Sequence, residues 1–319
     1  MCACAATADA TCPTRRRRNE RVDGLACGTA HVLSRGTASY LSPPHPSSAS
    51  GGGSGPHVWR CMSSLVELTR TPSFRLDGKR ALVTGGGRGI GLAAASALAQ
   101  AGAHVTLAAR TRADVEAATE AIRARGDKAE PLVLDVTDLG AVQAAIANAA
   151  PFNILINNAG TNRPAYLLDV KVEDFDLIFD LNVRAAFFVA QAVARRLIEA
   201  TQPGSIINIS SQMGHVGAAR RTVYCASKHA MEGFTKAMAI ELAPHNVRVN
   251  SLGPTFLETP MTRPFFQNEA FRNEVLSKIK LGRLGQLEEL TGAIVFLASE
   301  ASSLMTGAAM VIDGGWTAE

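Results

Sequence analysis

A glycine-rich turn between a short apolar run and an alanine-rich helix constrains the fold of this chain more than any other feature. The run Ala81–Thr84 reads as a buried strand, the turn has the sequence Gly-Gly-Gly-Arg-Gly-Ile-Gly, and a helical pattern follows. Gly85 allows a tight turn, Gly89 lets backbone N–H groups approach a pyrophosphate, and Gly91 permits close packing of the helix. An ordinary glycine loop is the alternative. The strand before the turn and the helix after it favour a dinucleotide site, because a helix N-terminus attracts anions.

Strand and helix patterns then alternate as far as residue 312. The predicted strands are 81–84, 105–109, 132–135, 154–157, 205–210, 247–251 and 310–312. Such alternation is typical of a parallel sheet covered by helices on both faces. We therefore expect an α/β protein with one Rossmann-type, doubly wound domain over residues 62–319, built on a seven-stranded parallel sheet. The apolar fraction of 47% is ample for its core, and no run of 18 apolar residues indicates a membrane span.

A second motif combines side chains suited to proton transfer. Tyr224 and Lys228 are four positions apart on a predicted helix and share one face, and Ser211 precedes Tyr224 by thirteen residues. A free phenol titrates near pH ~10, so it acts as acid and base near neutral pH only if a cation or hydrogen-bond donors stabilise the phenolate. A Tyr-x-x-x-Lys spacing alone is a weak signal, since a helix with one surface lysine also has it. The upstream glycine turn favours the catalytic interpretation.

These motifs occur in an order that closely resembles the short-chain dehydrogenase/reductase family, over residues 76–316. The residues that carry the resemblance are Thr84-Gly85-x-x-x-Gly89-Ile90-Gly91, Asp135-Val136, Asn157-Asn158-Ala159-Gly160, Asn182, Ser211, Tyr224-x-x-x-Lys228 and Pro254 to Thr259. The chain departs from the family pattern at Thr255, where glycine is usual. This departure puts the local backbone in question, because glycine often marks a positive φ.

The resemblance implies four catalytic residues and a role for each. Asn182 would hold a water in a proton relay, and Ser211 would orient a substrate carbonyl. Tyr224 would be the acid/base. Lys228 would lower the pKa of Tyr224 and hydrogen-bond the nicotinamide ribose.

The resemblance also implies a nicotinamide cofactor. Asp135 would hydrogen-bond the adenine amine, the turn 158–160 would lie along the adenosine, and Leu257 and Thr259 would face the carboxamide. The residues expected to bind the cofactor are Gly85, Gly87, Arg88, Gly89, Ile90, Gly91, Arg110, Asp135, Val136, Asn158, Ala159, Gly160, Tyr224, Lys228, Pro254, Leu257 and Thr259.

The choice of cofactor depends on the end of the second predicted strand. Sites that prefer NAD have an acidic residue there, whereas sites that prefer NADP have arginine near the 2′-phosphate. This strand ends in Ala108-Ala109-Arg110 without a carboxylate, so Arg110 and Arg88 are both candidates for a phosphate clamp. NADP(H) is therefore the expected cofactor, with NAD(H) as the alternative.

The substrate is less constrained. Gln212 and Arg263 are expected to contact it, although a loop arginine such as Arg263 is more often solvated. The stretch Asn157–Pro164 resembles that of gluconate 5-dehydrogenases, which favours a sugar acid or polyol. The alternative is a 3-oxoacyl thioester on acyl carrier protein, for which Arg220 and Arg221 could form a basic patch. A hypothesis from another class, a non-catalytic nucleotide-binding scaffold, is disfavoured because every catalytic position is intact.

Residues 1–61 differ in composition from the rest. They hold seven arginines, three acids and five of the six cysteines, and their net charge equals the +4 of the whole chain. The remainder is neutral overall, which disfavours a nucleic-acid-binding protein. The segment is interpreted as a transit peptide, as a disordered linker, or, our preference, as upstream sequence before a true start at Met62.

The domain itself indicates a reducing compartment and small-molecule partners. Cys225 is its single cysteine, so we expect a cytoplasmic protein, organellar only if residues 1–61 are a transit peptide. No metal site is expected, because His215 has no second ligand at zinc spacing. Neither nucleic acid nor a membrane is an expected partner. The family resemblance implies a homo-oligomer, either a dimer or a tetramer.

Overall fold

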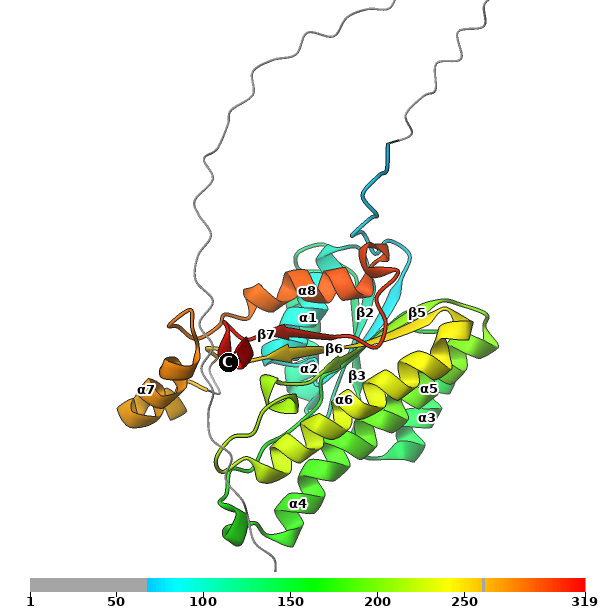
Figure 1. Cartoon of the computed structure of the whole chain (residues 1–319). Helices are drawn as coiled ribbons and strands as arrows, with labels where there is room; N and C mark the ends of the chain where they lie inside the picture. Colours follow the sequence, from blue (N-terminus) through cyan, green and yellow to red (C-terminus); the bar gives the residue numbers. More distant parts are fainter. Residues whose placement is uncertain (1–67, 260–261, 319) are drawn as a thin grey trace, which may run out of the picture. The chain divides into compact units, whose positions relative to one another are not determined.

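Seven parallel strands form the centre of the structure, a computed structural model that describes residues 68–259 and 262–318 (Figure 1). The strands are β1 (Arg80–Thr84), β2 (His104–Ala109), β3 (Ala129–Val133), β4 (Ile154–Asn157), β5 (Gly204–Ile209), β6 (Val247–Pro254) and β7 (Ala309–Ile312). Their order is β3-β2-β1-β4-β5-β6-β7, and every neighbouring pair is parallel. The predicted sheet is confirmed. All of it belongs to one unit, Glu67–Glu319, whereas the extension expected over residues 1–61 lies outside the described residues.

The direction of chain progress through the sheet reverses at β1, which lies between β2 and β4. From β1 the chain moves outward to β2 and β3, then crosses back to β4 and continues to β7. In open α/β sheets, ligands bind outside the carboxyl ends of the strands at such a reversal. The reversal here brings the glycine turn after β1 next to the segment after β4.

Helices cover both faces of the sheet (Figure 1). One face is covered by α1 (Gly89–Gln100), α2 (Arg112–Arg123) and α8 (Glu288–Ala298). The opposite face is covered by α3 (Leu139–Ala147), α5 (Ala186–Glu199) and α6 (Thr222–Leu242). Before α5 come α4 (Val172–Phe179) and a π-helical segment, Asp180–Ala185. After β6, α7 (Glu269–Lys278) stands apart from the helices that cover the sheet (Figure 1).

The core consists of two apolar layers, one on each face of the sheet. Successive residues of β1 alternate between them: Val83 packs with α1 and α8, and Leu82 packs with α5. Both side chains are fully buried. A strand covered on both faces has no solvent side, which explains why β1 appears in the sequence as a continuous apolar run.

The predicted position of the third strand is wrong. The sequence favoured residues 132–135, whereas β3 spans Ala129–Val133 and Asp135 lies in the loop that follows. β3 is the edge strand, so Pro131 is tolerated within it, and its side chains alternate between covered and solvent-facing positions. The prediction followed the apolar residues at the end of the strand and missed its beginning.

By length and composition alone, the helical stretch Val172–Glu199 could cross a membrane. In the described part of the chain this stretch comprises α4, the π-helical segment and α5. Val189, Val193 and Leu197 of α5 are buried in the apolar layer that α5 shares with α3 and the sheet. A core helix of this kind meets the same criteria as a membrane span.

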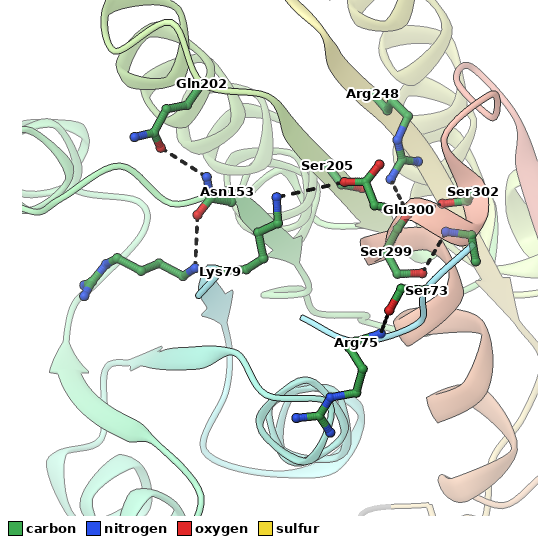
Figure 2. A network of polar contacts seen from close by, with 12 residues as sticks. Ser73, Arg75, Lys79, Asn153, Gln202, Ser205, Arg248, Ser299, Glu300 and Ser302 are labelled. Carbon is green, nitrogen blue, oxygen red and sulfur yellow. Dashed lines mark hydrogen bonds and ion pairs between the residues drawn. The ribbon is translucent and has the colours of Figure 1, made fainter. Parts of the chain in front are cut away.

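The amino ends of the strands are joined by polar contacts (Figure 2). Asn153, just before β4, accepts a hydrogen bond from the backbone N–H of Arg80 at 3.1 Å and donates one to Gln202 at 3.1 Å. Ser205 of β5 donates to the Leu297 carbonyl at 2.7 Å. The guanidinium of Arg248, at the start of β6, donates to the carbonyls of Leu297, Ser299 and Met305. These contacts connect the sheet to the end of α8, away from the glycine turn.

Candidate active site

The residues with predicted chemistry follow the carboxyl ends of neighbouring strands. Gly85 follows β1, Arg110 follows β2, Asn158 follows β4 and Ser211 lies just beyond β5. Because the strands are parallel, all four positions lie along one edge of the sheet. The structure therefore brings together residues that are more than a hundred positions apart in sequence.

The glycine turn has the geometry that an approaching diphosphate requires. Gly85 and Gly89 adopt positive φ angles of 64° and 55°. A Cβ atom on Gly91 would collide with the carbonyl of Gly85 and stand 2.6 Å from the amide of Asn158, so only glycine fits there. A Cβ on Gly89 would meet no atom within 4 Å, which leaves open space above the N-terminus of α1. These residues fit a dinucleotide cofactor.

Thr84 and Asn158 hold the turn in place, and the sequence had not singled out Thr84 for this role. The Thr84 hydroxyl accepts hydrogen bonds from the backbone N–H groups of Asn158 at 2.9 Å and Ala159 at 3.0 Å. The Asn158 amide donates to the carbonyls of Thr84 at 2.9 Å and Gly85 at 3.2 Å. The signal was present in the motif, since a threonine directly before the first glycine can bond across to the neighbouring strand.

Arg110 and Asp135, both expected to bind the cofactor, lie near each other. The Arg110 guanidinium is 3.8 Å from the Asp135 carboxylate, and the Arg110 side chain is 70% exposed. Asp135 accepts hydrogen bonds from the backbone N–H and the hydroxyl of Thr137. Burial alone would raise the pKa of Asp135, but these hydrogen bonds and the charge of Arg110 outweigh burial and lower it. Arg88, the N-cap of α1, is also exposed, so both arginines are free to reach a phosphate.

Four other residues that were predicted to bind the cofactor pack against the core or lie close to neighbouring side chains. Val136 is buried, and Ile90 packs against the core. A Cβ on Gly87 would stand 3.0 Å from Asp114 of α2, and a Cβ on Gly160 would stand 3.2 Å from the Asn182 side chain. These residues shape the floor of the site through their backbone and packing.

Tyr224 and Lys228 lie together on α6, facing the end of β5. The Lys228 ammonium is 5.7 Å from the centre of the Tyr224 ring and donates to the Ile209 carbonyl at 2.8 Å. Lys228 is 5% exposed, whereas Tyr224 is half-buried and accessible from the site. The predicted shared face is therefore present, next to Ser211.

Burial is the main influence on the pKa values of this pair. Burial raises the pKa of the Tyr224 phenol, and hydrogen bonding by Ser211 and the charge of Arg221 act in the opposite direction. Burial also lowers the pKa of Lys228 to about 8, against the influence of Glu232. The ammonium lies beside the Tyr224 ring and donates to the Ile209 carbonyl, and the lowering of the Tyr224 pKa by Lys228 stays a prediction.

Asn182 lies in the π-helical segment, where the helix widens. Its side chain accepts a hydrogen bond from the Thr161 N–H at 2.8 Å and donates to the Thr161 carbonyl at 2.9 Å and the Ser227 hydroxyl at 3.1 Å. Asn182 thereby joins α6 to the loop after β4. Single widened turns of this kind occur frequently at functional sites. Both polar atoms of the Asn182 side chain are therefore hydrogen-bonded to protein groups, and its role in a proton relay stays a prediction.

Gln212, expected to contact the substrate, is instead almost fully buried, with 2% of its surface exposed. Its side chain accepts a hydrogen bond from the Ser211 hydroxyl at 2.7 Å, and that hydroxyl accepts one from the Met213 N–H at 3.1 Å. This arrangement suits a residue that orients Ser211. Arg263, the other predicted substrate residue, is 67% exposed and lies 3.3 Å from the Glu258 carboxylate.

The segment after β6 keeps its backbone regular despite the departure at Thr255. Described non-glycine residues with positive φ are Thr201, Arg220 and Asn246, so Thr255 needs no glycine-like conformation. Its buried hydroxyl has no hydrogen-bond partner among the described residues. Pro254 ends β6, Leu257 is buried and bridges to Gly285, and the Thr259 hydroxyl lies 3.0 Å from that of Thr262.

Over the segment that contains these residues, the chain is similar to known proteins. The chain matches a protein family described as enoyl-(acyl carrier protein) reductase over residues 85–317, a range that includes the glycine turn, Ser211, Tyr224 and Lys228. D-erythrulose reductase from Gallus gallus is 39% identical over 245 residues, which cover 77% of this chain and 98% of that protein. Gluconate 5-dehydrogenase from Gluconobacter oxydans (strain 621H) is 42% identical over 248 residues, which cover 76% of this chain and 96% of that protein.

The fold comparison gives the same result. The crystal structure of a gluconate 5-dehydrogenase from Burkholderia cenocepacia J2315 in complex with NADP and tartrate superposes with a TM-score of 0.74. It is 38% identical, and the match covers 77% of this chain and 98% of that one. Sequence and fold similarity therefore extend over nearly the whole length of these relatives.

Proposed function

Because this chain belongs to the short-chain dehydrogenase/reductase family, we propose that it interconverts the secondary alcohol and the ketone of a sugar acid or polyol, with NADP(H) as cofactor. The observation that carries the proposal is the grouping of Ser211, Tyr224 and Lys228 at the carboxyl edge of the sheet, beside a glycine turn that fits a diphosphate. Similar chains named for erythrulose, xylulose and gluconate favour a polyhydroxylated substrate.

The chemistry follows from the placement of these residues. A bound nicotinamide supplies the hydride in reduction and accepts it in oxidation. Tyr224 donates its hydroxyl proton to the carbonyl oxygen during reduction and takes it back during oxidation. The Ser211 hydroxyl, which donates to Gln212 in this structure, would redirect that hydrogen bond to the same oxygen when substrate binds and keep the carbonyl aligned with Tyr224. The charge of Lys228 favours the phenolate that remains after the transfer.

The expected preference for NADP(H) depends on two exposed arginines. Arg110 directly follows β2, and Arg88 lies in the glycine turn. Arg110→Ala is expected to lower kcat/KM for NADPH about tenfold, or about 1.4 kcal/mol, with little change for NADH, because only NADPH carries the 2′-phosphate. Arg112→Ala is the matched control, since Arg112 is equally exposed and pairs with Glu116 on α2. A native enzyme that favours NADH tenfold would contradict the preference.

The substrate class is tested by measuring cofactor oxidation with three kinds of carbonyl compound. 5-Ketogluconate and a neutral polyhydroxy ketone such as erythrulose are expected to be reduced with a higher kcat/KM than simple ketones of the same size. An enzyme that reduces an acetoacetyl thioester but neither sugar derivative would contradict the proposal.

A 3-oxoacyl thioester is the second candidate, because two arginines lie at the start of α6, beside the site. The Arg220 guanidinium lies 5.5 Å from the centre of the exposed Tyr166 ring, and Arg221 is close enough to Tyr224 to affect its pKa. A basic surface here could receive an acidic carrier protein. Faster reduction of an acetoacetyl group on acyl carrier protein than of the sugar substrates would favour this candidate. Tight nucleotide binding without reduction of any carbonyl would favour the scaffold hypothesis.

Assembly and location belong to the same proposal. The outer surfaces of α5 and α6 form a groove whose apolar lining residues are Phe187, Ala190, Ala194, Ile198, Met238 and Leu242, and which Gln191, Arg195, Glu199 and Glu241 also line. We expect it to be covered by a second copy in a homo-oligomer, which light scattering of the native protein and of Phe187→Glu would test. A cytoplasmic location is expected, and import of a reporter fused to residues 1–61 into an organelle would contradict it.

A further inference from the structure

Glu232 is a buried carboxylate that has no part in the chemistry above. It lies one helical turn beyond Lys228 on α6 and is 6% exposed. Glutamates are rarely buried to this extent unless they are paired. The Ser251 hydroxyl of β6 donates to Oε2 of Glu232 at 2.6 Å. Its Oε1 is 3.5 Å from Nε2 of His215 and has no hydrogen-bond partner among the described residues.

The carboxylate also lies directly against the turn that carries Ser211. A Cβ atom on Gly214 would stand 3.1 Å from Cγ of Glu232 and 3.3 Å from its Oε1, so the backbone of Gly214 approaches Glu232 closely. Gly214 belongs to the 3-10 turn Gln212–Gly214, and its N–H donates to the Ser211 carbonyl at 2.8 Å. The Glu232 side chain therefore extends from α6 and packs against both this turn and β6.

We propose that Glu232 is a positioning residue of this site: its side chain packs against the turn that carries Ser211, and its charge, one helical turn from Lys228, stabilises the buried ammonium of Lys228. This inference rests on the proposed oxidoreductase function. The reason is electrostatic, because a buried ammonium loses part of its hydration and an opposite charge one turn away on the same helix offsets that loss. The charge of Glu232 opposes the fall in the pKa of Lys228 that burial causes.

Few other titratable groups lie near Lys228 and Glu232 in the described part of the chain. On α6 itself, Tyr224 lies next to Lys228. The turn after β5 contributes His215, while β5 and β6 contribute the neutral Ile209 carbonyl and the Ser251 hydroxyl. The widened segment before α5 reaches α6 through the neutral side chain of Asn182. Of the three acids of α4, Glu173 and Asp176 are exposed, and the half-buried Asp174 lies 3.8 Å from the Arg163 guanidinium.

The experiment follows the titration of Lys228 directly, in protein labelled with ¹³C at the lysine ε-carbon. Lys228→Arg assigns the signal by its disappearance. The native midpoint is expected near the value of about 8 given by the structure. In Glu232→Gln it is expected to fall by about one pH unit, because the nearest opposite charge is removed. Glu120→Gln, which removes an exposed carboxylate from α2, is expected to leave the midpoint unchanged.

Turnover gives the second readout. With the midpoint lowered by that amount, kcat of Glu232→Gln at pH 8 is expected to fall about fivefold and its alkaline limb to move to lower pH, while KM for NADPH stays the same. A loss of activity with an unchanged Lys228 midpoint would show a merely structural role and overturn the proposal. If Glu232→Gln does not fold, Glu232→Asp must show a smaller shift in the same direction, and no shift would overturn the proposal.

The two proposals fail in different ways. A native enzyme that reduces no carbonyl would end the proposed function, yet the Lys228 titration would still decide the role of Glu232. Conversely, an active enzyme whose Lys228 midpoint is the same in the native protein and Glu232→Gln would end the inference alone.

Discussion

The two ends of the sheet differ in what their polar side chains are bonded to. At the amino end, Asn153, Ser205 and Arg248 each complete hydrogen bonds with carbonyls or amides of neighbouring elements (Figure 2). At the carboxyl end, Lys228 is a buried cation whose pKa is lowered to about 8, and Oε1 of Glu232 has no hydrogen-bond partner among the described residues.

The polar contacts at the amino end bear mainly on stability, and the buried charges at the carboxyl end bear mainly on the proposed chemistry. Completed hydrogen bonds at the amino end contribute to folding, because breaking one leaves a buried carbonyl or amide unpaired. The buried cation at the carboxyl end costs folding free energy, and the same burial shifts its proton affinity into the range where enzymes transfer protons. A substitution at the amino end should therefore lower stability and leave turnover nearly unchanged. A substitution of the acid/base residue at the carboxyl end should lower turnover with little change in stability.

The largest expected effect is the loss of turnover in Tyr224→Phe, at the carboxyl end. Removal of the hydroxyl is expected to lower kcat about 10³-fold, because Tyr224 supplies the proton in the proposed chemistry. The thermal midpoint and the dissociation constant for NADPH are expected to stay close to the native values. Steady-state kinetics, thermal denaturation and fluorescence titration measure the three quantities. Retention of more than a tenth of native kcat would remove Tyr224 from its proposed role.

The next effect is a change in stability with pH at the same end. The folded pKa of Lys228, about 8, lies below its ordinary value of 10.5, so the unfolded chain binds more protons between these values. Stability from this group therefore rises as pH increases through that window, by about 3 kcal/mol in total. Relative to Lys228→Met, the native protein should gain this amount between pH 7.5 and 10.5 in urea denaturation. A constant difference between the two proteins would contradict the buried, shifted lysine.

The smallest of the three effects belongs to the amino end. Arg248→Met is expected to lower the free energy of unfolding by about 2 kcal/mol, because it leaves the carbonyls of Leu297, Ser299 and Met305 without their donor. kcat and KM should remain within twofold of native values. Urea denaturation and steady-state kinetics test this pair of outcomes. A large loss of kcat in the folded variant would remove the distinction between the two ends.

The sequence predicted features that depend on short segments and missed features that depend on contacts between distant segments. The strands came from apolar runs, and the glycine turn and the Tyr224–Lys228 spacing came from local geometry, so all were visible in short windows. β3 was misplaced because its edge position, which tolerates Pro131, is a property of the whole sheet. The burial of Gln212 was missed for a similar reason, since α6 and β6 enclose the turn that carries it.

By itself, the sequence determined the succession of strands and helices along the chain, the glycine turn and the spacing of Tyr224 and Lys228, because these depend on patterns over a few residues. Only the tertiary structure decided that Lys228 is buried with a lowered pKa, that Thr84 holds the turn after β4, and that Glu232 lies against the turn carrying Ser211. Burial and electrostatic coupling depend on which distant segments meet, and that is established only when the sheet and its two helical layers assemble.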